Sequence, residues 1–88
     1  MVAPAVQEVD LFLALLRLTS GAPATCHAEW NGSIQSFSIR CSRQARKILA
    51  WRLSQILARA FNVADEVWLL SQEEALAVIA ASHSSEVS

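Results

Sequence analysis

The most chemically versatile side chains of this sequence are two cysteines and two histidines: Cys26, His27, Cys41 and His83. A zinc site needs three or four ligands that converge on one point. Neighbouring residues of a strand point to opposite faces of a sheet, so Cys26 and His27 would be directed apart. His83 lies in a polar stretch near the end of the chain. The sequence therefore predicts no metal site, and no cofactor is expected.

Nucleophilic catalysis would need a serine or cysteine beside a histidine that an acid orients. On the hairpin predicted below, His27 lies opposite Ser36 and beside Glu29 on the solvent side. Such groupings are common on sheet surfaces and supply no oxyanion donors. The only glycines, Gly21 and Gly32, cannot build a glycine-rich phosphate loop. We expect a protein without catalytic activity, and an enzyme that uses His27 is the weakest alternative.

The composition is that of one small domain with a surplus of apolar side chains. The 88 residues are 53% hydrophobic and 17% charged, against typical values of about 45–50% and about 25%. One small core cannot hide all of that apolar surface, which favours a homodimer or a partner protein. We expect order from about residue 4 to residue 81 and a disordered polar tail over 82–88.

No signal for secretion or membrane insertion is recognised. The acids Glu8 and Asp10 precede the apolar run 11–16, and no Lys or Arg stands before it. The run is far shorter than the roughly 20 apolar residues that cross a bilayer. A cytoplasmic protein with reduced cysteines is expected.

The first predicted helix runs from about Ala5 to Thr19, with Pro4 in its first turn and Gly21 and Pro23 as a stop signal. Its apolar residues form two faces rather than one stripe. One face holds Val9, Phe12, Leu13 and Leu16. The other holds Leu11, Leu15 and Leu18, which we predict to be a dimer interface.

A β-hairpin is predicted around Asn31-Gly32, the preferred pair for a two-residue type I′ turn. With Trp30 opposite Ser33, one face of the hairpin becomes apolar and the other polar, and only Ile34 and Gln35 lie on the wrong sides. The apolar face is Cys26, Ala28, Trp30, Phe37, Ile39 and Cys41. In this register the two cysteines are four residues out of alignment, which is too far for a disulfide.

The second half of the chain predicts a helix, a strand and a helix. Ser42 caps a helix that runs to about Phe61, and Asn62 is its predicted left-handed terminator. The core stripe of this helix is Leu49, Leu53, Ile56, Leu57 and Ala60, with Ala45 at its margin. A buried strand over 67–70 follows.

A capping box of Ser71 and Glu74 then begins a final helix to about Ala81. The predicted fold is α+β in the order α-β-β-α-β-α, with an antiparallel hairpin and a third strand packed against helices. The alternative for the last part is one continuous helix over 65–81.

Charge is segregated along the chain. All basic side chains except Arg17 lie between positions 40 and 59, where no acid occurs. They are Arg40, Arg43, Arg46, Lys47, Arg52 and Arg59. Such a segment could contact nucleic-acid phosphates or an acidic protein patch. The alternative is internal neutralisation by the acids Glu8, Asp10, Glu66, Glu73 and Glu74.

The helical wheel places Trp51 opposite the core stripe, among polar side chains. An exposed tryptophan is typical of an interface, because tryptophan is enriched in binding hot spots. The alternative is that Trp51 packs against another helix, whereas Trp30 and Trp68 are assigned to the core.

We therefore expect a small non-catalytic protein-binding module: an adaptor, or an inhibitor of the kind that phages and mobile elements carry. Its predicted partner-binding residues are Trp51, Lys47, Gln55, Arg52 and Arg59, and its partner would present an acidic patch. The alternative is a nucleic-acid-binding or regulatory protein that uses Arg40, Arg43, Arg46 and Lys47.

Overall fold

The computed structural model describes residues 6–19 and 25–84. Its elements are α1 (Glu8–Leu18), β1 (Cys26–Asn31), β2 (Ser36–Cys41), α2 (Arg43–Leu57), β3 (Trp68–Leu70) and α3 (Gln72–Ser84). The strands form one antiparallel sheet in the order β1-β2-β3. The predicted α-β-β-α-β-α order is confirmed. Because Trp68–Leu70 pairs with β2, one continuous helix over 65–81 is excluded.

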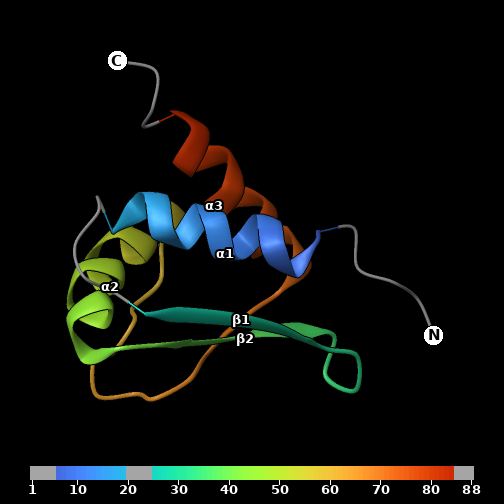
Figure 1. Cartoon of the computed structure of the whole chain (residues 1–88), viewed down its shortest axis with the longest axis horizontal. Coiled ribbons are helices and arrows are strands. Elements are labelled where there is room, and N and C mark those ends of the chain that lie inside the picture. The colour runs from blue at the N-terminus through green and yellow to red at the C-terminus, as the bar shows by residue number, and fades with distance from the viewer. Residues whose placement is uncertain (1–5, 20–24, 85–88) are drawn as a thin grey trace.

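Helices α1 and α3 cover one face of the sheet, and α2 stands at the end of the hairpin where β2 finishes (Figure 1). The core lies between these helices and the sheet. Its largest fully buried apolar members are Phe37, Leu11, Leu15, Ile39, Leu49, Leu53, Leu70 and Val78. No helix among residues 6–19 and 25–84 is long and apolar enough to cross a membrane.

Of the two apolar faces of α1, the face predicted to bind a second copy is the one that packs into the core. Leu11, Leu15 and Leu18 are all buried within the chain's own core. The prediction that they form a dimer interface is therefore wrong, because together they leave almost no surface for a second copy to cover. The face left exposed carries Val9 and Leu13. The predicted start at Ala5 and the stop signal at Gly21 and Pro23 lie outside the described residues.

The hairpin is confirmed, but its register differs from the predicted one by four residues. Trp30 lies opposite Phe37 rather than Ser33, and Asn31 lies opposite Ser36. Side chains alternate with a period of two, so an even shift leaves every residue on its predicted face. Phe37 is accordingly buried, and the half-buried Trp30 ring lies 4.9 Å from the Phe37 ring.

The register shifts because the connection has four residues, 32–35, rather than two. Asn31 stays in β1, and its side-chain Oδ1 accepts a hydrogen bond from the Ser33 N–H at 3.0 Å. Gln35 takes the left-handed conformation, with φ of 54°. Its side-chain amide donates to the Gly32 carbonyl at 2.8 Å. The turn therefore closes through side chains rather than through the type I′ geometry that Asn-Gly predicts.

Helix α2 begins as predicted and ends early. The Ser42 hydroxyl caps it by accepting a hydrogen bond from the Ala45 N–H. The helix terminates at Ala58, which has φ of 55° and ψ of 38°, and not at Asn62. Asn62 instead closes a later turn, with its Oδ1 accepting from the Ala64 N–H at 2.9 Å. Ala60, predicted in the core stripe, is therefore exposed beyond the helix.

The capping box at the start of α3 is confirmed in both directions. The Ser71 hydroxyl accepts from the Glu74 N–H, and Glu74 Oε1 accepts from the Ser71 N–H, each at 3.1 Å. Helix α3 continues to Ser84, and Ser82 is fully buried. The prediction of a disordered tail is therefore wrong for 82–84, and residues 85–88 lie outside the described part of the chain.

Candidate functional site

Trp51 projects from the solvent side of α2 and is 66% exposed. The core side of this helix is set by Ala45, Leu49 and Leu53, at spacings of four residues. Trp51 follows Leu49 by two residues, which is about 200° around the helix axis. The amphipathic pattern of α2 therefore forces the indole outwards, and the alternative that it packs against another helix is wrong.

A shallow hollow of about 310 Å³ opens beside Trp51 at the meeting of α1, α2 and α3. It is lined by Leu18, Trp51, Arg52, Gln55, Ile56 and Ala81. Four of these side chains are apolar, one from α1, two from α2 and one from α3, whereas Arg52 and Gln55 add polar groups from α2. We call this site the Trp51 hollow. It suits an apolar side chain whose flanking groups are polar.

Sequence reasoning identified the α2 side of this hollow and missed the rest. Leu18 and Ala81 come from α1 and α3, so only the packing of the helices brings them to Trp51. Gln55 and Lys47 are exposed one turn after and one turn before Trp51, on the same side of α2. The predicted grouping of Trp51, Lys47, Gln55 and Arg52 is therefore consistent with the observed positions.

Arg59 does not belong to this group, because it is held elsewhere. Its guanidinium donates to Glu74 Oε2 at 2.7 Å and Oε1 at 3.2 Å, and to the Leu69 carbonyl at 2.6 Å. It also lies 4.3 Å from the centre of the Phe61 ring. These hydrogen bonds from Arg59 lower the pKa of the Glu74 carboxyl. Arg59 therefore joins the end of α2 to β3 and α3.

Arg46 is likewise engaged inside the structure. Its Nε donates to the Val63 carbonyl at 2.9 Å, and a terminal nitrogen donates to the Cys41 carbonyl at 3.0 Å. These bonds join the start of α2 to the end of β2 and to the segment after the helix. Arg46, predicted as a phosphate contact, therefore has a structural role instead.

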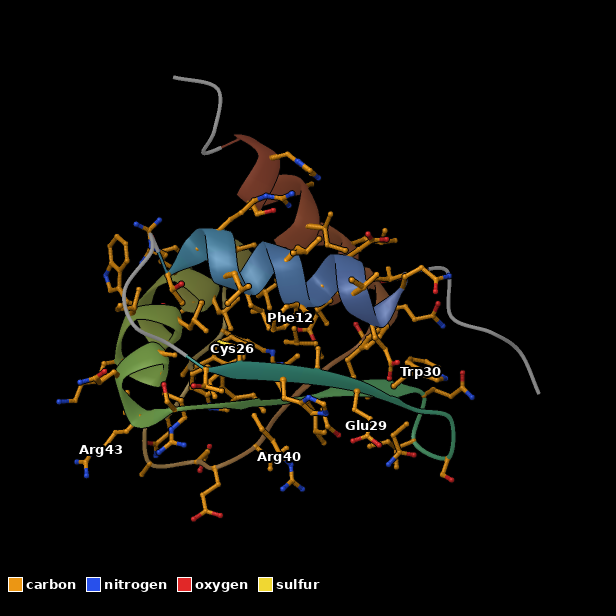
Figure 2. The ribbon with its side chains drawn as sticks, in the orientation of Figure 1. Phe12, Cys26, Glu29, Trp30, Arg40 and Arg43 are labelled. Carbon is orange, nitrogen blue, oxygen red and sulfur yellow. The ribbon has the colours of Figure 1, made fainter. Side chains whose placement is uncertain are left out.

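The other cations near the start of α2 remain exposed: Arg40, Arg43 and Lys47. Within the described residues, their side chains make no hydrogen bond or ion pair. Figure 2 shows Arg40 below the sheet and Arg43 at the start of α2, both directed away from α1 and α3. Internal neutralisation thus applies to Arg59, through Glu74, and not to these three.

The polar face of the hairpin does not bring His27 and Ser36 together. The observed register places His27 opposite Arg40, and Ser36 opposite Asn31. His27 Nε2 lies 3.9 Å from Glu29 Oε2, and both side chains are 69% exposed. The predicted cross-strand grouping of His27 with Ser36 is therefore wrong, because Arg40 occupies the position opposite His27.

The observed register pairs the two cysteines, which the predicted register had placed four residues out of alignment. Cys26 and Cys41 lie directly opposite each other on β1 and β2, and both are free thiols. A hydrogen bond between the two thiols lowers the pKa of Cys26, while the same bond and burial raise the pKa of Cys41. The signal for this pairing was the misplacement of Ile34 and Gln35, which a four-residue turn removes.

Among residues 6–19 and 25–84, no three His, Cys, Asp or Glu side chains gather as metal ligands would. Comparison of the chain with models of protein families, with curated proteins and with solved structures finds no match. The interpretation of the site therefore depends on its geometry alone.

Proposed function

We propose that the chain is a non-catalytic protein-binding module, an adaptor or inhibitor that covers part of a partner's surface with the outer side of α2. The observation that carries this proposal is the 66% exposure of Trp51 beside a hollow lined by three helices. Tryptophan buries about 150–250 Å² on full burial. Exposing it to water is costly unless a partner covers it.

The chemistry of the surrounding surface indicates the kind of partner. An apolar side chain can enter the Trp51 hollow between Leu18 and Ile56, while the indole covers it from the α2 side. Lys47 is exposed one turn away and makes no ion pair within the described residues, so it suits an acidic group on the partner. The proposed partner surface thus has an apolar knob beside an acidic patch.

The test starts with a photo-crosslinking amino acid at position 55, in place of the exposed Gln55 at the edge of the Trp51 hollow, and, as a matched control, at position 76. Leu76 is 49% exposed on α3 and does not line the Trp51 hollow. A protein that crosslinks from position 55 and not from position 76 is then purified and titrated with the unmodified chain, the Trp51→Ala variant and the Leu76→Ala variant.

We expect Trp51→Ala to weaken this binding at least about 30-fold, which corresponds to about 2 kcal/mol and is typical of a hot spot. Leu76→Ala should bind as the unmodified chain does. Because Trp51 touches the core so little, thermal unfolding of Trp51→Ala should match that of the unmodified protein. Equal loss of affinity in both variants would refute the assignment of the face.

A second candidate function is nucleic-acid binding through Arg40, Arg43 and Lys47, which are exposed and unpaired within the described residues. Without Arg46, three cations remain for phosphate contacts, so binding would be weak and steeply salt-dependent. The test is fluorescence anisotropy with labelled single-stranded DNA, duplex DNA and RNA at low and physiological salt. Replacing Arg43 and Lys47 by Gln should abolish such binding, while Trp51→Ala should leave it unchanged.

A further inference from the structure

The Cys26–Cys41 pair occupies the type of sheet position at which side chains approach most closely. In an antiparallel ladder, hydrogen-bonded and non-hydrogen-bonded pairs alternate. The neighbouring pair, Thr25 and Ser42, is hydrogen-bonded, because the Ser42 N–H donates to the Thr25 carbonyl at 2.7 Å. Cys26 and Cys41 therefore form a non-hydrogen-bonded pair.

A second hydrogen bond supports this assignment independently. Trp30, four residues after Cys26, has its N–H bound to Glu8 Oε2 at 2.6 Å rather than to β2. Since main-chain groups alternate in direction along a strand, the N–H of Cys26 also points away from β2. Cα atoms of non-hydrogen-bonded pairs are about 4.5 Å apart, which lies inside the range of about 4.4–6.8 Å that disulfides need.

The side chains of the two cysteines also point the same way. Both belong to the face of the hairpin that packs against the helices, where they are direct cross-strand neighbours. Cys26 is 5% exposed, whereas Cys41 is half-buried and is the more accessible of the two residues. The pair thus combines one thiol that can meet an oxidant with a second thiol that is already in contact with the first.

We propose that Cys26 and Cys41 form a reversible intrachain disulfide by exchange with a small-molecule disulfide such as oxidised glutathione. Cys26, whose pKa is the lowered one, loses the first proton to solvent and then takes the proton of Cys41. The Cys41 sulfur attacks one glutathione sulfur, which forms a mixed disulfide and releases one glutathione thiolate, and this thiolate removes the proton from Cys26. The Cys26 thiolate then attacks the Cys41 sulfur and releases the second glutathione. The two protein thiols lose their protons and are oxidised to one disulfide, and oxidised glutathione is reduced to two glutathione molecules.

The proposed bond joins the beginning of β1 to the end of β2, one residue before the cap of α2. It closes the loop over 26–41, which includes the whole hairpin. A loop of this length restricts the unfolded chain enough to raise the midpoint of thermal unfolding by roughly 10–20 °C, if the native geometry takes up the bond without distortion. Thiol redox conditions would then set the stability of the sheet without touching Trp51.

The test uses the folded, full-length protein incubated with oxidised glutathione, then alkylated and measured by intact mass under non-reducing conditions. We expect a monomer that has lost two hydrogens, reacts with no alkylating reagent and unfolds at a higher temperature; dithiothreitol should reverse all three changes. The Cys26→Ala variant should instead hold one glutathionyl group on Cys41. Cys41→Ala should gain none while it remains folded, because Cys26 is buried.

Other products would overturn the proposal. If the unmodified protein keeps two alkylatable thiols after this treatment, accumulates glutathionyl groups or forms disulfide-linked dimers, the native pair does not close. The same incubation in urea provides the control, because an intrachain disulfide that forms only in the unfolded chain would exclude the cross-strand geometry as its cause.

Discussion

Replacing Ala58 by glycine should stabilise the protein, although alanine is normally better than glycine within a helix. Ala58 terminates α2 in the left-handed conformation, with φ of 55° and ψ of 38°. A side chain with a Cβ atom pays roughly 1–2 kcal/mol for this conformation, because Cβ crowds the following carbonyl oxygen. Glycine has no Cβ and avoids that cost.

The gain is partly offset in the unfolded state, where glycine has more conformations to lose. That entropy costs about 0.4–1 kcal/mol, so the net stabilisation by Ala58→Gly should be about 0.5–1 kcal/mol. For a domain of this size, such a gain raises the midpoint of thermal unfolding by roughly 2–8 °C. The assay is urea unfolding followed by tryptophan fluorescence, with the midpoint rising and the slope unchanged.

Ala60 supplies the matched control. It is exposed two residues further along and does not have positive φ. Ala60→Gly should therefore lower stability by up to about 1 kcal/mol through the unfolded-state term alone. If both glycine variants destabilise the protein equally, Ala58 is not held in the left-handed conformation and the observed end of α2 is wrong.

Two further predictions concern single side-chain contacts. Hydrogen bonds from Arg59 lower the pKa of Glu74 in the folded protein. The Arg59–Glu74 pair therefore stabilises the fold fully above the unfolded-state pKa of about 4.5, and this stabilisation is lost as pH falls through the folded-state pKa. Between pH 7 and pH 3, the free energy of unfolding measured with urea should therefore fall more for the unmodified protein than for Glu74→Gln. Parallel curves of this free energy against pH would contradict the pairing. Glu8→Ala leaves the Trp30 N–H without its acceptor at the outer edge of β1 and should cost about 0.5–1.5 kcal/mol in the same assay. An unchanged free energy of unfolding would mean that water replaces the Glu8 carboxylate as the acceptor for the Trp30 N–H.

Local signals in the sequence predicted the elements well, because each has its cause within a few residues. Ser71 and Glu74 satisfy each other's backbone N–H groups, and Ser42 caps α2, as the spacing indicated. The faces of the hairpin were also right, since alternation is insensitive to an even shift. The predicted register was wrong, because Asn-Gly here does not form the usual two-residue type I′ turn. The Ser33 N–H instead donates a hydrogen bond to the Asn31 side chain within a four-residue connection.

Features that depend on contacts between distant parts of the chain could not be predicted from the local sequence. The end of α2 moved from Asn62 to Ala58, where Arg59 meets Glu74 from a helix that begins much later in the chain. The choice between the two apolar faces of α1 is of the same kind, because either face could pack against a sheet. Periodicity shows that a helix has two apolar sides, but only the position of α3 and the sheet decides which one is covered.

The basic side chains of residues 40–59 include some that are bound within the structure and some that remain available to a partner. Arg46 donates to the Cys41 and Val63 carbonyls and Arg59 donates to the Leu69 carbonyl, so these hydrogen bonds fix α2 relative to β2, to β3 and to the segment that follows the helix. Lys47 follows Arg46 directly and points about 100° away from it around α2, on the side of Trp51, and it makes no such bond within the described residues. A partner that covers Trp51 would therefore meet Lys47 and the Arg52 side chain of the Trp51 hollow beside an exposed indole, and not a continuous basic stripe. That arrangement favours a protein surface with one acidic group near an apolar side chain over a phosphate backbone, which rewards many cations at regular spacing.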